Sequence, residues 1–235
     1  MPTRIVQSKQ NDRLKQLRRA LARPAHKSEK ASGLVALEGP NLVEEALRAR
    51  LAIDALFLAE SFQHWLQQLA LPAETEVLIV PGGILASILT TENPQPVAAL
   101  VHPPAFAWAD LLSAPSPLLL ILAGLQDPGN LGAILRSAEA FGASGVVALP
   151  GTVSPWNPKA LRASAGSALR VPILAATPDE CFTHLQQARI PILAAVPQPS
   201  SKTPLHAMAN PVALLLGNEG NGIPPELLAR ADSHI

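Results

Sequence analysis

The amino-acid sequence predicts an α/β protein of two domains, each with helices packed on its own sheet. Short apolar runs alternate with amphipathic segments along the 235 residues, as they do where strands and helices follow one another. Hydrophobic residues make up 48% of the chain and charged residues 15%, which is enough apolar material for buried cores. The stretch 102–116, rich in proline and alanine, breaks the alternation. We therefore expect domains at 1–101 and 117–235, joined by a linker at 102–116.

The first domain is expected to be a small α/β domain that begins with a basic helix. Residues 8–22 place Leu14, Leu17 and Leu21 on one helical face, and Pro24 ends the helix. The remaining elements expected here are strands at 34–37, 53–58, 77–80 and 97–101, and helices after the Gly39-Pro40-Asn41 turn, at 62–69 and at 83–90.

The second domain is expected to contain a parallel sheet, because its apolar runs suit strands that are buried on both faces. Strands are expected at 117–123, 146–149, 171–174, 190–196 and 212–216, and helices at 130–141, 157–168, 178–188 and 224–231. The last three residues, Ser233-His234-Ile235, look like the start of a further strand. Ligands of such sheets bind at the carboxyl ends of the strands.

The formal net charge is zero, but the first thirty residues are strongly basic. They hold nine Lys and Arg residues against Asp12 and Glu29, whereas the rest of the chain is acidic overall. A basic arm on an acidic body indicates a polyanionic partner, and it is equally typical of a solvated helix. The arm residues expected to contact such a partner are Arg18, Arg19 and Arg23.

Several other classes of protein are disfavoured by the sequence. No apolar run approaches the roughly 18 residues of a membrane span, and the polar, basic N-terminus does not resemble a signal peptide. The single cysteine, Cys181, favours a reducing, cytoplasmic setting. The six histidines lack the spacing of metal ligands, so no metal site is expected.

The segment that carries most chemical information is 118–149. A buried strand runs through the turn 126–129 into a helix, which presents backbone N–H groups and the positive helix end to the sheet edge. Asn130 and Arg136 are six residues apart and so lie on different helical faces. The ordinary interpretation makes Asn130 an N-cap and pairs Arg136 with an acid such as Glu139. The dinucleotide fingerprint G-x-G-x-x-G is absent.

Several segments in order resemble one known family, the SpoU (TrmH-like) RNA ribose 2′-O-methyltransferases. Residues 130–136 (NLGAILR) are similar to its motif N-x-G-x-x-x-R, and 214–223 (LLLGNEGNGI) resemble its second motif. Between them, 157–166 (NPKALRASAG) resemble an internal stretch of the family. Near the N-terminus, 36–47 and 90–101 resemble the start and end of the substrate-binding domain that many members carry.

The resemblance implies a fold, a cofactor and partners. The fold is a C-terminal α/β-knot (SPOUT) methyltransferase domain with a deep trefoil knot, after a small N-terminal α/β substrate-binding domain. The cofactor is S-adenosylmethionine, held in the knot loops. The partners are RNA, with rRNA favoured over tRNA, and a second copy of the chain in a homodimer when full length.

The family's third motif, a strand followed by S-L-N-V, should begin directly after Ile235 and is absent from this sequence. We therefore expect either a fragment of a longer product, which is favoured, or a degenerate member. The alternative function is a non-catalytic RNA-binding protein. A third hypothesis, an ordinary doubly wound nucleotide-binding enzyme, is disfavoured by the missing phosphate fingerprint.

The resemblance assigns catalytic roles to Asn130, Arg136 and Glu219. Arg136 is implied to act on the ribose hydroxyl. Because a guanidinium is effectively always protonated, it stabilises an alkoxide or holds a phosphate more easily than it acts as a base. Asn130 is expected to orient Arg136 or the ribose. Glu219 is expected to fix the second loop through backbone N–H groups or to pair with Arg136, and a loop-capping carboxylate is the alternative.

The resemblance also assigns residues to the cofactor and to RNA. Both sets of residues have an ordinary structural alternative. Apolar residues at a strand end can belong to the core, and basic residues are typical of a helix that faces solvent. The expected cofactor-binding residues are Ala194, Ala195, Val196, Leu216, Gly217, Asn218, Gly222 and Ile223, and Lys159 and Arg162 are expected to contact phosphates.

Overall fold

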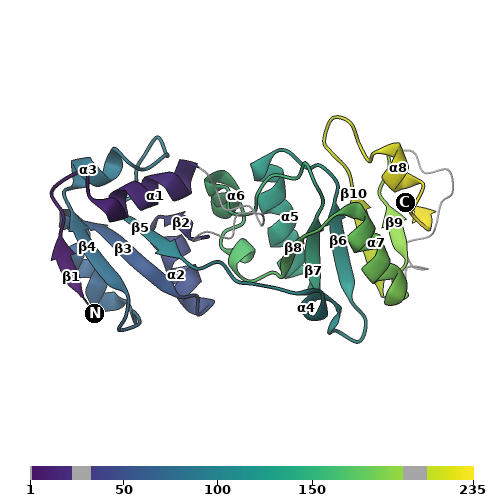
Figure 1. Ribbon diagram of the computed structural model, residues 1–235, viewed down its shortest axis with the longest axis horizontal. Helices are drawn as coiled ribbons and strands as arrows, with labels where there is room; N and C mark the ends of the chain where they lie inside the picture. The colour runs from purple at the N-terminus through teal and green to yellow at the C-terminus, as the bar shows by residue number, and fades with distance from the viewer. Residues whose placement is uncertain (1, 23–32, 198–210) are drawn as a thin grey trace. The chain divides into compact units, whose positions relative to one another are not determined.

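A computed structural model describes residues 2–22, 33–197 and 211–235 (Figure 1). The chain divides into two compact units. Unit 1 comprises Met1–Pro104 and Ser154–Leu169, and unit 2 comprises Ala105–Val153 and Arg170–Ile235. Each unit has its own sheet, so the predicted α/β class with two sheets is confirmed.

The sheet of unit 1 has five strands in the order β1-β4-β3-β5-β2. Strands β1, β3 and β4 are parallel, whereas β5 runs antiparallel to both β2 and β3. The short β1 was not predicted, because its three exposed residues carry no apolar pattern. The bounds of the strands are β1 Thr3–Ile5, β2 Val35–Glu38, β3 Ile53–Ala59, β4 Glu76–Val80 and β5 Val97–Val101.

The helices of unit 1 pack on this sheet through their apolar residues. Leu14, Leu17 and Leu21 are buried on α1, as predicted, although the helix begins at Asp12 and not at residue 8. The helix expected at 62–69 is a 3-10 helix, η1, in which only Trp65 is buried. The bounds are α1 Asp12–Ala22, α2 Pro40–Arg48, η1 Glu60–Gln68, α3 Gly82–Ala86, α6 Pro158–Ala163 and η2 Ser167–Leu169.

Helix α6 belongs to unit 1, although its sequence lies between two strands of the other sheet. It contacts strand β2, and Gly166, just after it, lies against α2. A Cβ on Gly166 would stand 2.7 Å from Cγ of Glu45, and its φ of +90° suits glycine. The sequence order predicted that 157–168 belongs with the second domain. The contacts of the segment instead group it with unit 1.

The sheet of unit 2 has six strands in the order β11-β9-β10-β6-β7-β8, and every neighbouring pair is parallel. The predicted parallel sheet is confirmed, as is the strand at the end of the chain. The bounds are β6 Leu118–Leu122, β7 Gly145–Ala148, β8 Ile173–Ala175, β9 Ile192–Ala194, β10 Val212–Leu216 and β11 Ser233–His234. The knot implied by the resemblance stays a prediction, because 198–210, between β9 and β10, lies outside the described residues.

One face of this sheet carries a core formed with α4 (Trp108–Leu112), α7 (Pro178–Gln187) and α8 (Pro225–Leu228). Leu111 on α4 is fully buried there. The expected linker 102–116 therefore contains a helix that packs into unit 2, which its alanine-rich sequence did not reveal. Helix α5 (Pro128–Ala140) buries a separate set of residues, Leu131, Gly132, Leu135 and Ala138.

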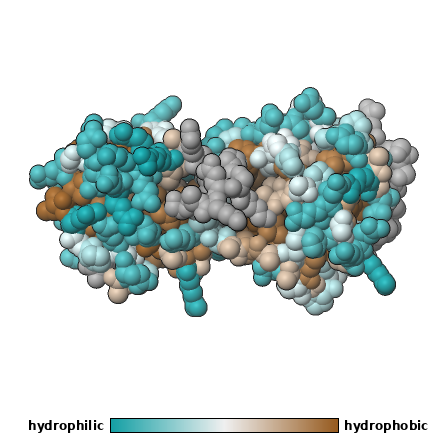
Figure 2. All heavy atoms as spheres, viewed as in Figure 1, coloured by the Kyte–Doolittle hydropathy of each residue, from teal (hydrophilic) through white to brown (hydrophobic). Residues whose placement is uncertain are grey.

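Hydrophilic side chains cover much of the face seen in Figure 2, with hydrophobic ones in smaller areas between them. Most large apolar side chains lie inside the two cores, and the exceptions include Ile5 and Phe141, which are exposed. Among the described helices, none is long and apolar enough to cross a membrane. Within the same residues, no group of three or more His, Cys, Asp and Glu side chains is arranged to hold a metal ion.

Candidate functional site

The candidate site lies at the carboxyl ends of strands β6, β9 and β10, which are neighbours in the sheet of unit 2. Because these strands are parallel, the segments that follow them emerge at one edge. The segments are the turn 123–127 before α5, the end of β9 at 194–196 and the loop 217–223. The predicted catalytic and cofactor-binding residues fall in these segments or on α5, except Leu216, which is the last residue of β10.

Glu219, in the loop after β10, joins that loop to the turn before α5. Its carboxylate accepts a hydrogen bond from Nδ2 of Asn130 at 3.1 Å. It also accepts the backbone N–H groups of Asp127 at 3.2 Å and of Gln126 at 3.4 Å. The two motif segments, about ninety residues apart in the sequence, are thus held together by one carboxylate.

These contacts also set the charge of Glu219. Its pKa is lowered from the ordinary value of 4.5, first because its own backbone N–H donates to the carboxylate. Slight desolvation opposes this effect, while the amide of Asn130 and the N–H groups of Gln126 and Asp127 add to it. Glu219 is therefore an anion at neutral pH that acts as a hydrogen-bond acceptor for the turn.

The helix cap differs from the sequence-based interpretation. The N-cap of α5 is Asp127, whose Oδ1 accepts the backbone N–H of Asn130 at 2.8 Å. The ordinary interpretation of Asn130 as the cap is therefore wrong. The signal for Asp127 was present in the sequence, because an acid directly before a proline is a common helix start. This arrangement leaves the amide of Asn130 free to reach Glu219.

Arg136 is exposed on α5, and within the described part of the chain it forms no hydrogen bond or ion pair. The acid once considered as its partner, Glu139, instead accepts a hydrogen bond from Nη2 of Arg170 at 3.0 Å. Neither Asn130 nor Glu219 bonds to Arg136 in the structure. The site therefore brings Asn130 and Glu219 together and leaves the guanidinium of Arg136 available to a ligand.

The loop after β10 is a tight turn closed by its own backbone. Asn218 and Gly222 exchange two backbone hydrogen bonds, each 2.9 Å long. A Cβ on Gly217 would lie 2.2 Å from the carbonyl carbon of Gly222, so no other residue fits this position without moving the backbone. The side chain of Asn218 is used inside the protein, because its Oδ1 accepts the N–H groups of Gly220 and Asn221.

The neighbouring strand end provides apolar surface that suits an adenosine. Ala194 is fully buried, whereas Ala195, Val196, Leu216 and Ile223 are partly exposed. Val196 and Ile223 pack on the same core from two different loops. Small apolar walls beside a glycine-rich turn are the features that a nucleoside pocket requires. The residues present therefore fit S-adenosylmethionine.

The predicted RNA contacts lie in unit 1. Arg18 and Arg19 are exposed on α1, and Lys159 and Arg162 are exposed on α6. Arg23, the other predicted arm residue, lies outside the described residues. The structure thus places all the described basic candidates in the unit that does not contain Asn130 and Glu219.

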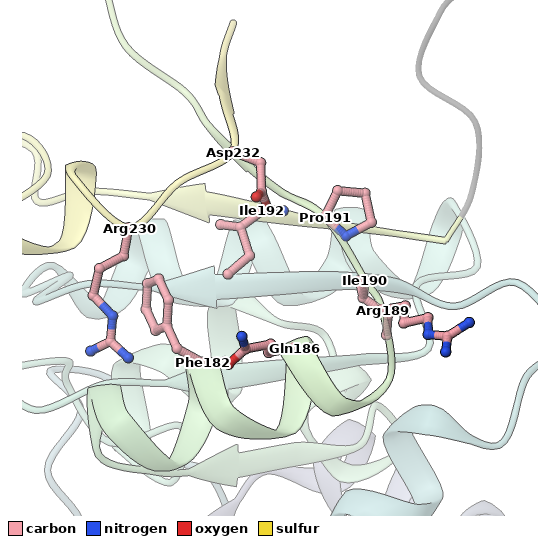
Figure 3. A pocket seen from close by; sticks show the side chains of 8 residues that line it. All are labelled: Phe182, Gln186, Arg189, Ile190, Pro191, Ile192, Arg230 and Asp232. Atoms are coloured by element: carbon pink, nitrogen blue, oxygen red, sulfur yellow. Dashed lines mark hydrogen bonds between the residues drawn. The ribbon is translucent and has the colours of Figure 1, made fainter.

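A surface pocket lies elsewhere on unit 2, between α7 and the beginnings of β9 and β11 (Figure 3). Arg230 stacks on the ring of Phe182 at 4.0 Å and pairs with Asp179 at 2.8 Å. Asp232 accepts the backbone N–H of Ile192 at 2.8 Å. The pocket is therefore at the amino ends of the strands, away from the edge where parallel sheets bind their ligands.

Comparisons with known proteins agree with this architecture. Residues 117–235 match the SpoU rRNA Methylase family, and residues 36–107 match the domain described as RNA 2′-O ribose methyltransferase substrate binding. The crystal structure of an AdoMet-bound rRNA methyltransferase from Sinorhizobium meliloti aligns with a TM-score of 0.83 at 28% identity, covering 99% of this chain and 87% of that one.

Two relatives extend the likeness over most of the sequence. The 23S rRNA (guanosine(2553)-2′-O)-methyltransferase RlmP of Bacillus subtilis is 29% identical over 203 residues, or 85% of this chain and 77% of the relative. An uncharacterized tRNA/rRNA methyltransferase of Synechocystis is 32% identical over 231 residues, or 95% of this chain and 81% of the relative. The chain therefore belongs to the SpoU rRNA methylase family and is an RNA 2′-O-methyltransferase.

Proposed function

We propose that the chain methylates a ribose 2′-OH in ribosomal RNA, with Arg136 acting on the hydroxyl. The observation that carries the proposal is the Asn130–Glu219 hydrogen bond, which fixes the start of α5 at the site, while Arg136 on the same helix has no partner among the residues that the structure describes. Support for rRNA as the substrate comes from the 23S rRNA enzyme of Bacillus subtilis, which is similar over most of the chain.

The protein's task in this reaction is mainly alignment. S-adenosylmethionine is the cofactor, and when bound it supplies an already activated methyl group. We assign Ala194, Ala195, Val196, Leu216 and Ile223 to the walls around it, with Gly217 and Gly222 allowing close approach of the backbone. The residues of the site hold the acceptor oxygen in line with this methyl group. Such alignment accounts for much of the rate enhancement at sites of this kind.

In the transfer the S–CH3 bond of the donor breaks as the O–CH3 bond forms, and the hydroxyl proton leaves to water. Arg136 is proposed to stabilise the negative charge that develops on the ribose oxygen, or to hold the neighbouring phosphate. A guanidinium acts as a base only where burial destabilises its charge. Arg136 is exposed, and none of the described residues pairs with it, so its planar donor groups are available for an oxyanion. Asn130 and Glu219 are proposed to position α5 and not to touch the reacting atoms.

Unit 1 is proposed to supply general affinity for RNA. Its exposed bases Arg18, Arg19, Lys159 and Arg162 suit contacts with phosphates, which position an RNA without reading its sequence. Two further expectations belong to the proposal: that the protein forms a homodimer, and that it works in the cytoplasm, as its single cysteine first indicated.

The experiment that tests the proposal compares Arg136→Ala and Arg136→Lys with the wild-type chain. Methyl transfer is measured from labelled cofactor to rRNA and, separately, to tRNA, and cofactor affinity is measured by calorimetry. Arg136→Ala should abolish transfer and leave cofactor affinity nearly unchanged, since the pocket walls are in other segments. Arg136→Lys should lose most activity without moving the pH optimum, because a bidentate donor is lost.

The matched control is Arg189→Ala, which removes another exposed arginine of unit 2. It should leave transfer unchanged. Near-normal transfer by Arg136→Ala would remove Arg136 from the site. A shifted pH optimum in Arg136→Lys would indicate a base. Absence of transfer by the wild-type chain, despite bound RNA and cofactor, would instead favour the non-catalytic RNA-binding protein.

A further inference from the structure

Gly124, the second residue after β6, is hydrogen-bonded on both sides by side chains from neighbouring loops. Its backbone N–H donates to Oγ1 of Thr152 at 3.2 Å. Its carbonyl oxygen accepts a hydrogen bond from Nδ2 of Asn218 at 2.8 Å. Thr152 follows β7 and Asn218 follows β10, the two strands that flank β6 in the sheet. Three adjacent strand ends are thus joined at one glycine.

The Thr152 hydroxyl uses both its donor and its acceptor capacity in this contact. It donates to the carbonyl oxygen of Leu122, the last residue of β6, at 2.9 Å while accepting from Gly124. The next residue reinforces the link, because the backbone N–H of Val153 donates to the carbonyl oxygen of Leu125 at 2.8 Å. The hydroxyl therefore holds the chain at the point where it leaves the sheet.

Asn218 also uses both ends of its amide. Its Oδ1 accepts the N–H groups of Gly220 and Asn221 at 2.9 and 3.0 Å and so shapes the loop after β10. Its Nδ2 then attaches this shaped loop to Gly124. An aspartate in this position would keep the acceptor and lose the donor.

Gly124 benefits from such support because it has no side chain of its own to pack. Its φ of +73° lies in the left-handed region, and no heavy atom lies within 4 Å of the place where a Cβ would stand. A glycine in this conformation has many alternatives of similar energy. Hydrogen bonds from two sides restrict it to one, which reduces the ordering cost when a ligand binds against the turn.

We propose that Thr152 and Asn218 are positioning residues that clamp Gly124, and through it hold the turn before α5 against the loop 217–223. The inference rests on the proposed function, since it takes these two segments to hold the cofactor. The clamp acts on the loops directly and on Arg136 only through α5, which its own buried residues also hold in place. Its loss is therefore expected to weaken cofactor binding more than it slows transfer.

The first test compares Thr152→Val with Thr152→Ser in steady-state methyl transfer. Valine keeps the shape and removes the hydroxyl, whereas serine keeps the hydroxyl. Thr152→Val removes both hydrogen bonds of the hydroxyl and should raise KM for the cofactor about fivefold. The change in kcat should be less than about twofold, because saturating cofactor reimposes the loop geometry. Thr152→Ser should stay near wild type. Thr183→Val, an exposed threonine on α7, is the matched control.

The second test uses Asn218→Asp, which places a carboxylate against the carbonyl of Gly124. It should raise KM for the cofactor about tenfold, since repulsion adds to the lost hydrogen bond. Asn221→Asp adds the same charge to the same loop at an exposed position and should raise KM far less. A similar increase in both variants would mean that charge, and not the clamp, is responsible, and would overturn the inference.

Hydrogen exchange separates this inference from the proposed function. In the free protein, without RNA or cofactor, Thr152→Val should speed amide exchange in peptides covering 123–128, and Thr152→Ser should not. This result is independent of whether Arg136 acts in transfer. Thermal unfolding is measured in parallel. Unchanged exchange and unchanged KM in a folded Thr152→Val variant, or a lower melting temperature with unchanged KM, would overturn the positioning role.

Discussion

Two arginines, one in each unit of this molecule, are used in opposite ways. In unit 1, Arg13 on α1 donates to Glu76 and to Asp54, both at 2.7 Å, and Glu76 also pairs with Arg4 at 2.6 Å. In unit 2, Arg136 stands exposed on α5 with no ion pair to any described residue. The first arrangement uses charge to join a helix to strands, and the second leaves charge available for a ligand.

The sheets of the two units also differ. In unit 1 the antiparallel β5 lies between β2 and β3, so each edge of the sheet has loops that follow some strands and loops that precede others. In unit 2 every pair is parallel, and the loops that follow β6, β7, β9 and β10 collect at one edge. A parallel sheet therefore brings residues from distant segments to one place, which is why the hydrogen-bonded site lies there.

The largest expected effect on cofactor affinity is that of Gly217→Ala, because the loop 217–223 has no room for a side chain at this position. The added Cβ would lie 2.2 Å from the carbonyl carbon of Gly222 and 2.4 Å from the backbone nitrogen of Ile223. Both atoms belong to the backbone, so the turn must open. We expect cofactor affinity, measured by calorimetry, to fall about 100-fold, since steric strain of this kind costs a few kcal/mol.

Gly220→Ala is the matched control for this prediction. Gly220 lies in the same loop, and its Cβ would make only an ordinary contact, 3.6 Å from Oδ1 of Asn218. It should change affinity little. Equal losses in the two variants would show that any added side chain disturbs the loop, and that the fit at Gly217 is not special.

The next effect concerns Glu219, whose carboxylate joins the two motif segments. Glu219→Gln keeps the shape but replaces one acceptor oxygen by a donor that faces other donors. We expect cofactor affinity to fall about tenfold at neutral pH, because hydrogen bonds to a charged group are lost. Glu226→Gln, at an exposed position on α8, should have no effect. Unchanged affinity in Glu219→Gln would show that the loops hold their positions without this carboxylate.

The same residue gives a dependence on pH. The pKa of Glu219 is lowered in the folded protein, mainly by its own backbone N–H and then by the Asn130 amide. Its contribution to stability is therefore complete above the ordinary glutamate pKa and is lost as the pH falls through the lowered folded value. The difference in melting temperature between wild type and Glu219→Gln should therefore shrink as the pH falls below the ordinary glutamate pKa. A constant difference would contradict this role.

Much of the fold follows from local patterns in the sequence. The buried runs 118–122 and 212–216 have the continuous apolar character of strands covered on both faces, and both are strands. The leucines of α1 repeat at helical spacing and are buried. What the sequence did not show is which unit a segment joins. Helix α6 and the buried Leu111 are examples, because an apolar residue packs equally well on either sheet.

The site was predicted unevenly, for a related physical reason. Motif similarity identified Asn130 and Glu219, and the structure joins them. Thr152 and Gly124 carried no signal, because their contact depends on which strands become neighbours and not on any local period. Partner choice was also beyond local reasoning, since Glu139 pairs with Arg170, 31 residues away, and not with Arg136 one turn before it.

The smallest expected effects come from unit 1. They distinguish the ion-paired Arg13 from the exposed Arg18 and Arg19 on the same helix. Arg13→Ala removes a half-buried side chain from the network with Asp54 and Glu76, and should lower the free energy of unfolding by about 1 kcal/mol. It should leave the salt dependence of RNA binding unchanged. The double change of Arg18 and Arg19 to Ala should weaken the salt dependence of RNA binding and leave the free energy of unfolding nearly unchanged, because both side chains are exposed on the same helix.

The measurement is the slope of log K against log salt for RNA binding, together with denaturant unfolding of each variant. Each phosphate contact contributes about 0.7 to 0.9 to the slope, so losing Arg18 and Arg19 should flatten it by between one and two. If Arg13→Ala flattens the slope equally, the ion pairs of unit 1 open to bind RNA. If the double variant changes nothing, α1 is only a solvated helix. The next bases to replace would then be Lys159 and Arg162, the predicted phosphate contacts that are exposed on α6.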